Sequence, residues 1–341
     1  MNEMPDIEGS AQMSCRQCMA GEPVYEVKFD DDADGTVAND IARFLEKTGA
    51  LAKMTSDAIL IRESAVPDFY DFCLDHMSPD RMTYRMDEGA WKPMKEMPQD
   101  LRERWVEGVI AEERVVPYAQ PIMTAEGDVF GYEVLARFLA QDGRLVSPAE
   151  VFAAAKRRNR LYALDRVCRL AAVRSSVHLR GRVFINFIPT SIYSPQHCLR
   201  STTALTRELG LDASRFVFEV VESEHVDDVE HLKSILAYYT EQGFSYALDD
   251  VGEGFSTPEL LREIKPHYMK LDRSAADGVS SDPEKQKTAG ELLRTALQIG
   301  AVPLAEGIER EDDYLWLRAT GYRLFQGYLW GRPEPVRKIG V

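Results

Sequence analysis

Oxygen-bearing side chains recur between residues 133 and 326, each at the end of a short apolar run. The candidate ligands are Glu133, Asn186, Glu219, Asp249, Asp250 and Glu306. Carboxylate and amide oxygens, without His or Cys, prefer Mg²⁺ or Mn²⁺ to Zn²⁺. Two such cations can activate a water molecule while they neutralise charge on a phosphate and on the leaving oxygen. These residue types therefore favour metal-dependent hydrolysis of a phosphodiester.

Asp249 and Asp250 are adjacent, and one of them could bridge two cations. Successive residues of a strand point to opposite faces, so both carboxylates reach one site only if the strand ends there. Gly252 and Gly254 would allow that turn. The pair therefore predicts a strand end at the metal site.

Lys270 lies in the segment YMKLDRS, which predicts a short strand. Alternation places Lys270 and Asp272 on one face, and Met269 and Leu271 on the other. We therefore expect Lys270 to point inward among the carboxylates. A lysine in that position would orient the attacking water or stabilise the developing negative charge.

The apolar runs before these residues have the length and composition of buried strands, and a helical segment follows most of them. They include RVFINF, FVFEVV, SYALDD, YMKLD and VPLAEG. About seven to eight strand–helix units over about 230 residues are typical of a (β/α)8 barrel, in which the strand ends meet at one face. A doubly wound open sheet is the alternative fold. One acidic residue at a strand end is usually a helix cap or a loop residue, but several at successive ends indicate a site.

Residues 1–98 predict a separate small α/β domain. Its predicted strands are 23–29, 58–62 and 82–86, and its predicted helices are 36–48 and 67–76. Prolines at 93 and 98 break the pattern, and we place the boundary with a second domain, residues 99–341, near residue 98. Asp100 is expected to cap the first helix of that second domain. Because residues 1–98 hold no catalytic constellation, we expect a sensory or regulatory role for them.

Composition limits the partners and the compartment. The net charge of −15 argues against DNA or RNA polymers as partners, because these require clustered Lys and Arg. The chain has no apolar run of the ~18 residues that a membrane span needs, and its first residues lack the features of a signal peptide. We therefore expect a cytoplasmic protein that does not insert into membranes. Its five cysteines are then expected to be thiols.

Two short motifs near the N-terminus carry weaker signals. Cys15 and Cys18 have the spacing of half a zinc site or of a redox pair, but no second pair accompanies them. A reduced, disordered tail is the expectation there. The acidic turn DDDADG at 30–35 lacks the Glu that an EF-hand needs at its twelfth position, so we expect a solvated turn.

Residues from about 110 to 337 resemble the EAL domain, the bacterial cyclic di-GMP phosphodiesterase family. The signature tripeptide is Glu133-Val134-Leu135, followed by Arg137 as in the family's extended ExLxR form. The remaining motifs are NFIP with Asn186, FEVVES with Glu219 and Glu222, DDVGEGFST with Asp249 and Asp250, MKLDRS with Lys270, AEGIE with Glu306 and Glu309, and QGYLWGRP with Gln326 and Pro333. Glu253 departs from the family's usual small residue and is expected to face solvent.

The resemblance implies one active site with two cations, Mg²⁺ or Mn²⁺. The ligands of the first would be Glu133, Asn186, Glu219 and Asp249, and those of the second Asp249, Asp250 and Glu306. The catalytic residues would be Lys270, which contacts the nucleophilic water, Asp250 and Glu309. The substrate would be bound by Arg137, Leu135, Gln326 and Pro333, with the Arg137 fork on a phosphate. Glu222 would anchor the DVGEGFST loop.

Two functions compete within this resemblance. The first is a phosphodiesterase that opens cyclic di-GMP to linear pGpG, and the second is a catalytically silent EAL module that binds the nucleotide or another protein. Silent members typically lack some of the carboxylates or the lysine, and this chain has them all, which favours the enzyme. A homodimer through the EAL domain is a further expectation. Because the chain has no G-G-D/E-E-F motif, cyclase activity is not expected.

Overall fold

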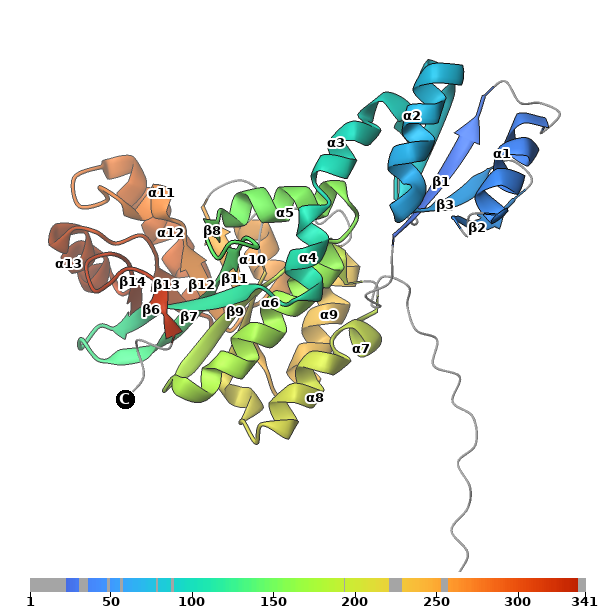
Figure 1. Cartoon of the computed structure of the whole chain (residues 1–341). Helices are drawn as coiled ribbons and strands as arrows, with labels where there is room; N and C mark the ends of the chain where they lie inside the picture. The colour runs from blue at the N-terminus through green and yellow to red at the C-terminus, as the bar shows by residue number, and fades with distance from the viewer. Residues whose placement is uncertain are drawn as a thin grey trace, which may run out of the picture. The chain divides into compact units, whose positions relative to one another are not determined.

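Figure 1 shows the computed structural model of the chain. It describes residues 23–30, 36–47, 50–55, 58–77, 79–86, 89–192, 194–220, 229–252 and 257–336. These residues form two compact units. The first contains the residues up to Glu107 together with Ala154–Ala163, and the second contains Gly108–Ala153 together with the residues from Leu164 onward. Cys15, Cys18, Glu222, Glu253 and residues 31–35 lie outside the described residues.

The first unit is built on an antiparallel sheet of the strand order β2-β3-β1-β4-β5. The strands are β1 (Val24–Phe29), β2 (Leu51–Met54), β3 (Ile59–Arg62), β4 (Met82–Met86) and β5 (Lys92–Pro93), and the helices are α1 (Thr36–Lys47) and α2 (Val66–His76). Tyr25 and Val27 of β1 are fully buried, whereas their neighbours along the strand are half-buried. This alternation confirms the predicted strands. The short strands β2 and β5 were not predicted, because neither shows a period-2 apolar pattern.

Asp100 was predicted to cap a helix, and this prediction is wrong. It lies inside α3 (Met97–Arg102), whose N-cap is Glu96, and a second helix follows as α4 (Trp105–Ala111). The buried carboxylate of Asp100 instead accepts hydrogen bonds from Tyr84 Oη at 2.8 Å and from Lys92 Nζ at 2.8 Å. The helix begins earlier than expected because a proline occupies its first turn.

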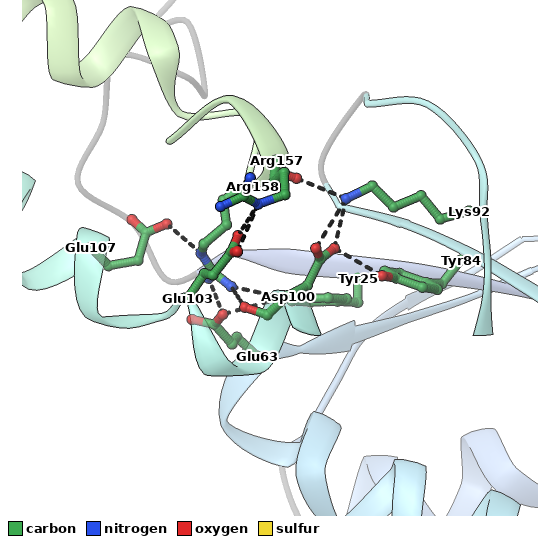
Figure 2. A network of polar contacts seen from close by, with 9 residues as sticks. All are labelled: Tyr25, Glu63, Tyr84, Lys92, Asp100, Glu103, Glu107, Arg157 and Arg158. Atoms are coloured by element: carbon green, nitrogen blue, oxygen red, sulfur yellow. Dashed lines mark hydrogen bonds and ion pairs between the residues drawn. The ribbon is translucent and has the colours of Figure 1, made fainter. Parts of the chain in front are cut away.

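A buried polar network joins the segment Ala154–Ala163 to the rest of the first unit (Figure 2). The guanidinium of Arg158, with no exposed surface, forms an ion pair with Glu63 and donates to the backbone oxygen of Asp100 at 2.8 Å. It also donates to Tyr25 Oη at 3.2 Å and to Glu107 Oε1 at 3.3 Å. Burial raises the pKa of Glu107, against the opposing effect of Arg160 and Arg158. Local sequence patterns could not predict this network, because Arg158 and Tyr25 are 133 positions apart in the chain.

The second unit is a closed barrel of eight strands surrounded by helices. In order around the barrel the strands are β6 (Val115–Thr124), β14 (Leu324–Gln326), β13 (Val302–Ala305), β12 (Tyr268–Leu271), β11 (Ser245–Val251), β10 (Phe216–Val220), β9 (Arg182–Phe187) and β7 (Val129–Leu139). A pairing between β6 and β7 closes the ring. The predicted barrel is thereby confirmed, with one difference. Strand β6 runs antiparallel to both of its neighbours, whereas the other seven strands are parallel.

Helices between the strands complete the strand–helix pattern. They are α5 (Pro148–Arg157), α6 (Leu161–Ser175), α7 (Pro195–Cys198), α8 (Arg200–Glu208), α9 (Val229–Glu241), α10 (Pro258–Ile264), α11 (Arg273–Ala276), α12 (Pro283–Ile299) and α13 (Glu311–Thr320). Two-residue strands, β8 (Leu145–Val146) and β15 (Glu334–Pro335), pair with β7 and β6. Among the described residues, no helix has both the length and the apolar composition needed to cross a membrane.

A layer of apolar side chains packs together across the barrel. Its buried members are Ile122, Phe184, Val217, Ala247, Tyr268, Leu304 and Leu324. On the six strands from β9 to β14, each member precedes a polar residue by two positions, as Phe184 precedes Asn186 and Leu324 precedes Gln326. Because side chains two positions apart share a face of a strand, the polar residues form the next layer above this apolar one. The apolar layer therefore forms the floor of the candidate site.

Candidate active site

One polar side chain from each barrel strand contributes to the layer above the floor. These residues are Gln120, Glu133, Asn186, Glu219, Asp249, Lys270, Glu306 and Gln326, with Glu306 one position beyond the end of β13. Strand pairing sets Asn186 directly beside Glu219, and Glu133 directly beside Gln120. Five of the six predicted metal ligands therefore lie in this layer with Lys270, and the sixth, Asp250, has a carboxylate oxygen within 4.8 Å of Asp249 and Glu306. Glu133 lies in the middle of the long strand β7, not at its end as predicted.

Lys270 is buried among the carboxylates, as its alternation pattern predicted. Its Nζ lies 2.5 Å from Glu306 Oε1, 2.6 Å from Glu219 Oε1 and 2.9 Å from Asp249 Oδ1. Burial alone would lower the pKa of Lys270, but Asp249, Glu133, Glu219 and Glu306 outweigh it and hold that pKa well above its ordinary value. This direction favours the charged ammonium, which can donate hydrogen bonds to the carboxylates around it.

The carboxylates differ in how their surroundings affect them. Burial raises the pKa of Glu219 and of Glu306 well above the ordinary value despite Lys270, and neighbouring carboxylates add to the effect. Burial opposes ionisation of Glu133 too, but Lys270 and hydrogen bonds from Gln326 and Asn186 outweigh it and lower the pKa of Glu133. Crowding around one ammonium thus favours the protonated forms of Glu219 and Glu306. Added positive charge, such as that of a bound cation, would favour their ionised forms.

Amide side chains hold both oxygens of Glu133. Asn186 Nδ2 donates to Oε1 at 2.9 Å, and Gln326 Nε2 donates to Oε2 at 2.6 Å. Because its nitrogen faces Glu133, Asn186 presents its amide oxygen as the atom that could bind a cation. Gln326 also donates to Gln120 Oε1 at 3.0 Å. The sequence interpretation missed Gln120, although a buried Gln within the apolar run VVPYAQPIM was an available signal.

Asp249 and Asp250 both reach the site, at the end of β11 and with the help of a backbone irregularity. Strand β11 continues to Val251, and its pairing with β12 is irregular between Leu248 and Val251. Asp250 has a φ of +52°, a left-handed conformation that is rare for a residue other than glycine. This bulge turns the second carboxylate to the side of the first. The strand thus ends one residue after the pair, close to the predicted position, and the two carboxylates converge as predicted.

The residues fit a divalent-cation site. One carboxylate oxygen from each of Asp249, Asp250 and Glu306 lies within 4.8 Å of the others. Glu219 Oε2 is buried and accepts no hydrogen bond from any residue that the structure describes. A buried acceptor without a donor is costly, and a cation would satisfy it. Since every donor in this set is oxygen, its chemistry suits Mg²⁺ or Mn²⁺.

Glu309, predicted to be a catalytic residue, pairs with a residue outside the polar layer. Its carboxylate forms an ion pair with Arg273, whose Nη2 is 2.9 Å from Glu309 Oε1, and both side chains are more than a third exposed. Gly307 allows this arrangement, because a Cβ at that position would meet Arg273 Cγ at 2.3 Å. A catalytic role for Glu309 stays a prediction.

A cavity of about 220 Å³ opens beside Asn186. Leu135 and Arg137, predicted to bind substrate, line it, whereas the predicted residue Pro333 is half-buried and does not. The Arg137 guanidinium is held by Ala136 O at 2.9 Å and by the ring of Tyr118 at 5.4 Å. Helices α5 and α6 complete the wall with Pro148, Phe152, Asp165, Cys168 and Ala172, which the sequence did not single out.

Residues 100–333 match the family described as the EAL domain. The probable cyclic di-GMP phosphodiesterase PdeG of Escherichia coli is 31% identical over 230 residues, which cover 64% of this chain and 44% of that protein. The cyclic di-GMP phosphodiesterase NbdA of Pseudomonas aeruginosa is 26% identical over 251 residues, covering 72% of this chain and 31% of that protein. The chain thus spans less than half the length of these two curated relatives.

Solved structures show the same fold. A standalone EAL protein from Vibrio cholerae, in its c-di-GMP bound form, superposes with a TM-score of 0.59 at 30% identity, covering 65% of this chain and 93% of that one. A manganese/cyclic di-GMP complex of Klebsiella pneumoniae BlrP1 gives a TM-score of 0.59 at 19% identity, covering 92% of this chain and 96% of that one. A coverage of 92% includes residues before position 100, so the likeness in fold extends into the first unit.

Proposed function

Because the chain belongs to the EAL-domain family, we propose that it is a phosphodiesterase that hydrolyses cyclic di-GMP to linear pGpG with Mg²⁺ or Mn²⁺. One observation carries the proposal above all. The site keeps a full set of oxygen donors in one layer, with Lys270 buried among them at 2.5–2.9 Å from three carboxylates. A module that only bound the nucleotide would have no need for so costly a cluster of buried charges.

In this proposal the chain would hold two cations. The ligands of the first would be Glu133, Asn186, Glu219 and Asp249, and those of the second Asp249, Asp250 and Glu306. Bound cations would supply charge neutralisation at the phosphate and a lowered pKa for a water molecule. The amides of Asn186 and Gln326 keep the Glu133 carboxylate in a single orientation, which preserves the geometry of the site between turnovers.

The remaining roles belong to charged side chains around the scissile bond. Hydrolysis adds water across one P–O bond of the ring, so the attacking oxygen bonds to phosphorus and a proton passes to the leaving oxygen. The Lys270 ammonium would orient the attacking water or stabilise negative charge that develops on the phosphate. Arg137 would bind a phosphate from the wall of the cavity, where Ala136 and Tyr118 already hold its guanidinium.

The catalytic proposal is tested by incubating the purified full chain with cyclic di-GMP and Mn²⁺ or Mg²⁺, and separating the products by chromatography. We expect linear pGpG to accumulate, the reaction to stop on addition of a chelator, and Glu133→Gln to be inactive. A folded, metal-loaded chain that binds cyclic di-GMP but leaves it intact over hours would establish the silent module in its place.

Two further proposals concern control of the site. The family resemblance suggests a homodimer through the EAL domain, which analytical ultracentrifugation would detect. Residues 1–98 would form the regulatory part, because the predicted ligands and catalytic residues all lie after them. A change in turnover on replacing residues in the first unit, with cation affinity unchanged, would support regulation.

A further inference from the structure

Gln120 occupies a place that only the reversed strand β6 can provide. On the other strands from β9 to β14, the polar layer lies two residues after the apolar floor, but on β6 it lies two residues before Ile122. Gln120 pairs directly across the ladder with Glu133. Its side chain is 7% exposed, so its amide is buried in the site.

Hydrogen bonds fix the orientation of this amide and of its neighbour. Gln120 Nε2 donates to the backbone oxygen of Gly331 at 3.1 Å. A carbonyl oxygen can only accept, so the Gln120 nitrogen must face Gly331 and its Oε1 must face the opposite way, toward Gln326. Gln326 must then present its NH₂ group to Gln120, and this same group donates to Glu133 Oε2 at 2.6 Å. The Gly331 carbonyl thus fixes the Gln120 amide, and the Gln120 oxygen and the Glu133 carboxylate together fix the Gln326 amide.

The consequence lies at the amide oxygen of Gln326. Both hydrogens of its NH₂ group are used, one for Gln120 and one for Glu133. Its Oε1 is buried and accepts no hydrogen bond from the described part of the chain. If Gln120 could not accept, one N–H of the buried Gln326 amide would lose its acceptor, and this amide would be held less firmly against Glu133.

We propose that Gln120 is a positioning residue of this site, which acts through Gln326 to keep the Glu133 carboxylate hydrogen-bonded and the Gln326 oxygen available to a bound ligand. The inference rests on the proposed cation site at Glu133. Groups that orient a ligand of a metal typically change metal affinity or activity about 10–100-fold when they are replaced.

The test measures Mn²⁺ affinity by isothermal titration calorimetry on the full chain without nucleotide. We expect Gln120→Met to weaken Mn²⁺ binding by about tenfold or more. Gln286→Met is the matched control, because Gln286 also donates to a backbone carbonyl, that of Ser280 at 3.1 Å, but does so on α12. Its Mn²⁺ affinity should remain that of the wild type. If Gln120→Met does not fold, Gln120→Asn can replace it in the test. The Asn side chain is too short to bridge Gly331 and Gln326, so we expect the same weakening of Mn²⁺ binding.

A double-mutant cycle separates positioning from general loss of packing. If Gln120 acts through Gln326, then Gln120→Met should have no further effect on Mn²⁺ affinity in a chain that already carries Gln326→Met. Additive losses, or wild-type affinity in Gln120→Met, would overturn the inference. A wild-type chain that binds no Mn²⁺ would overturn it together with the proposed function. Mn²⁺ binding without hydrolysis would refute only the proposed function, and the affinities would still decide the role of Gln120.

Discussion

Lys270 Nζ lies 2.6 Å from Glu219 Oε1, and neither side chain is more than 1% exposed. The two residues come from β12 and β10, which are separated by β11. Such a buried pair is stable only while the surrounding charges remain balanced. Without a cation, Lys270 is the positive charge in contact with Glu219, Asp249 and Glu306.

We therefore predict that Lys270→Met abolishes turnover and destabilises the metal-free chain by about 3–5 kcal/mol, because buried carboxylates lose their partner. Added Mn²⁺ should restore part of this stability, since it replaces the missing positive charge. Urea denaturation with and without Mn²⁺ measures both effects. Lys233→Met is the control: Lys233 is 36% exposed between Glu230 and Glu263, so its loss should cost less than about 1 kcal/mol. If the metal-free Lys270→Met chain were as stable as the wild type, Lys270 would not stabilise the buried carboxylates as predicted.

Arg137→Met should weaken substrate binding and leave the cations in place. We expect KM for cyclic di-GMP to rise about 10–100-fold, since hydrogen bonds to a charged group contribute about 1.5–3 kcal/mol. Arg137→Lys should restore little, because an ammonium lacks the planar fork and its stacking on Tyr118. Steady-state kinetics at saturating Mn²⁺ checks this, with the surface variant Arg174→Met as control. A fall in kcat at unchanged KM would place Arg137 elsewhere in the mechanism.

Arg158 and Arg157 are adjacent but should differ strongly in their effect on stability. Arg158 has no exposed surface and contacts Glu63, Tyr25 and Glu107, whereas Arg157 is 43% exposed in its pair with Glu103 (Figure 2). Arg158→Met should cost about 3–5 kcal/mol, because it leaves buried carboxylates unpaired. Arg157→Met should cost about 1 kcal/mol or less. Urea denaturation measures the free energy of unfolding of both variants. Equal losses of stability would contradict the prediction that Arg158 matters more than Arg157.

The network around Arg158 also affects the expected stability of a chain that lacks residues 1–98. The sequence predicts that residues 1–98 form a separate domain. Their removal, however, takes away Tyr25 and Glu63, which are partners of Arg158, and leaves Arg158 in the remaining chain. We expect the fragment 99–341 to be less stable than the full chain, and Arg158→Met to cost the fragment much less than it costs the full chain. A fragment with the stability and the activity of the full chain would show that residues 1–98 form an independent domain.

Asp313 should make a pH-dependent contribution to the stability of the barrel. Burial opposes ionisation of Asp313, but backbone N–H groups of Ser280 and Gly278, at 2.9 and 3.0 Å, outweigh it and lower its pKa. A depressed folded-state pKa stabilises the fold above the unfolded-state pKa of about 4, and this contribution disappears as the pH falls through the folded-state value. Asp313→Asn should therefore cost about 1–3 kcal/mol at pH 7 and progressively less below pH 4. Asp312→Asn, 75% exposed, is the control in urea denaturation at each pH.

The sequence by itself determined which residues could form the site. Asn186, Glu219 and Lys270 each lie at the next-to-last position of a strand, and the period of two along a strand places such residues on the face of the apolar floor. Local patterns also identified the barrel and most strands of the first unit. These features depend on neighbours within a few positions, which is why they could be read directly.

The tertiary structure decided what depends on partners distant in the chain or on backbone irregularity. The reversed direction of β6 placed Gln120 beside Glu133, and a left-handed Asp250 within a bulge turned two adjacent carboxylates to one side. The pairing of Glu309 with Arg273, and the network around Arg158, depend on contacts between segments whose approach no local pattern encodes. Alternation fixes only the face on which a side chain lies. Strand direction, bulges and long-range packing determine which groups meet there.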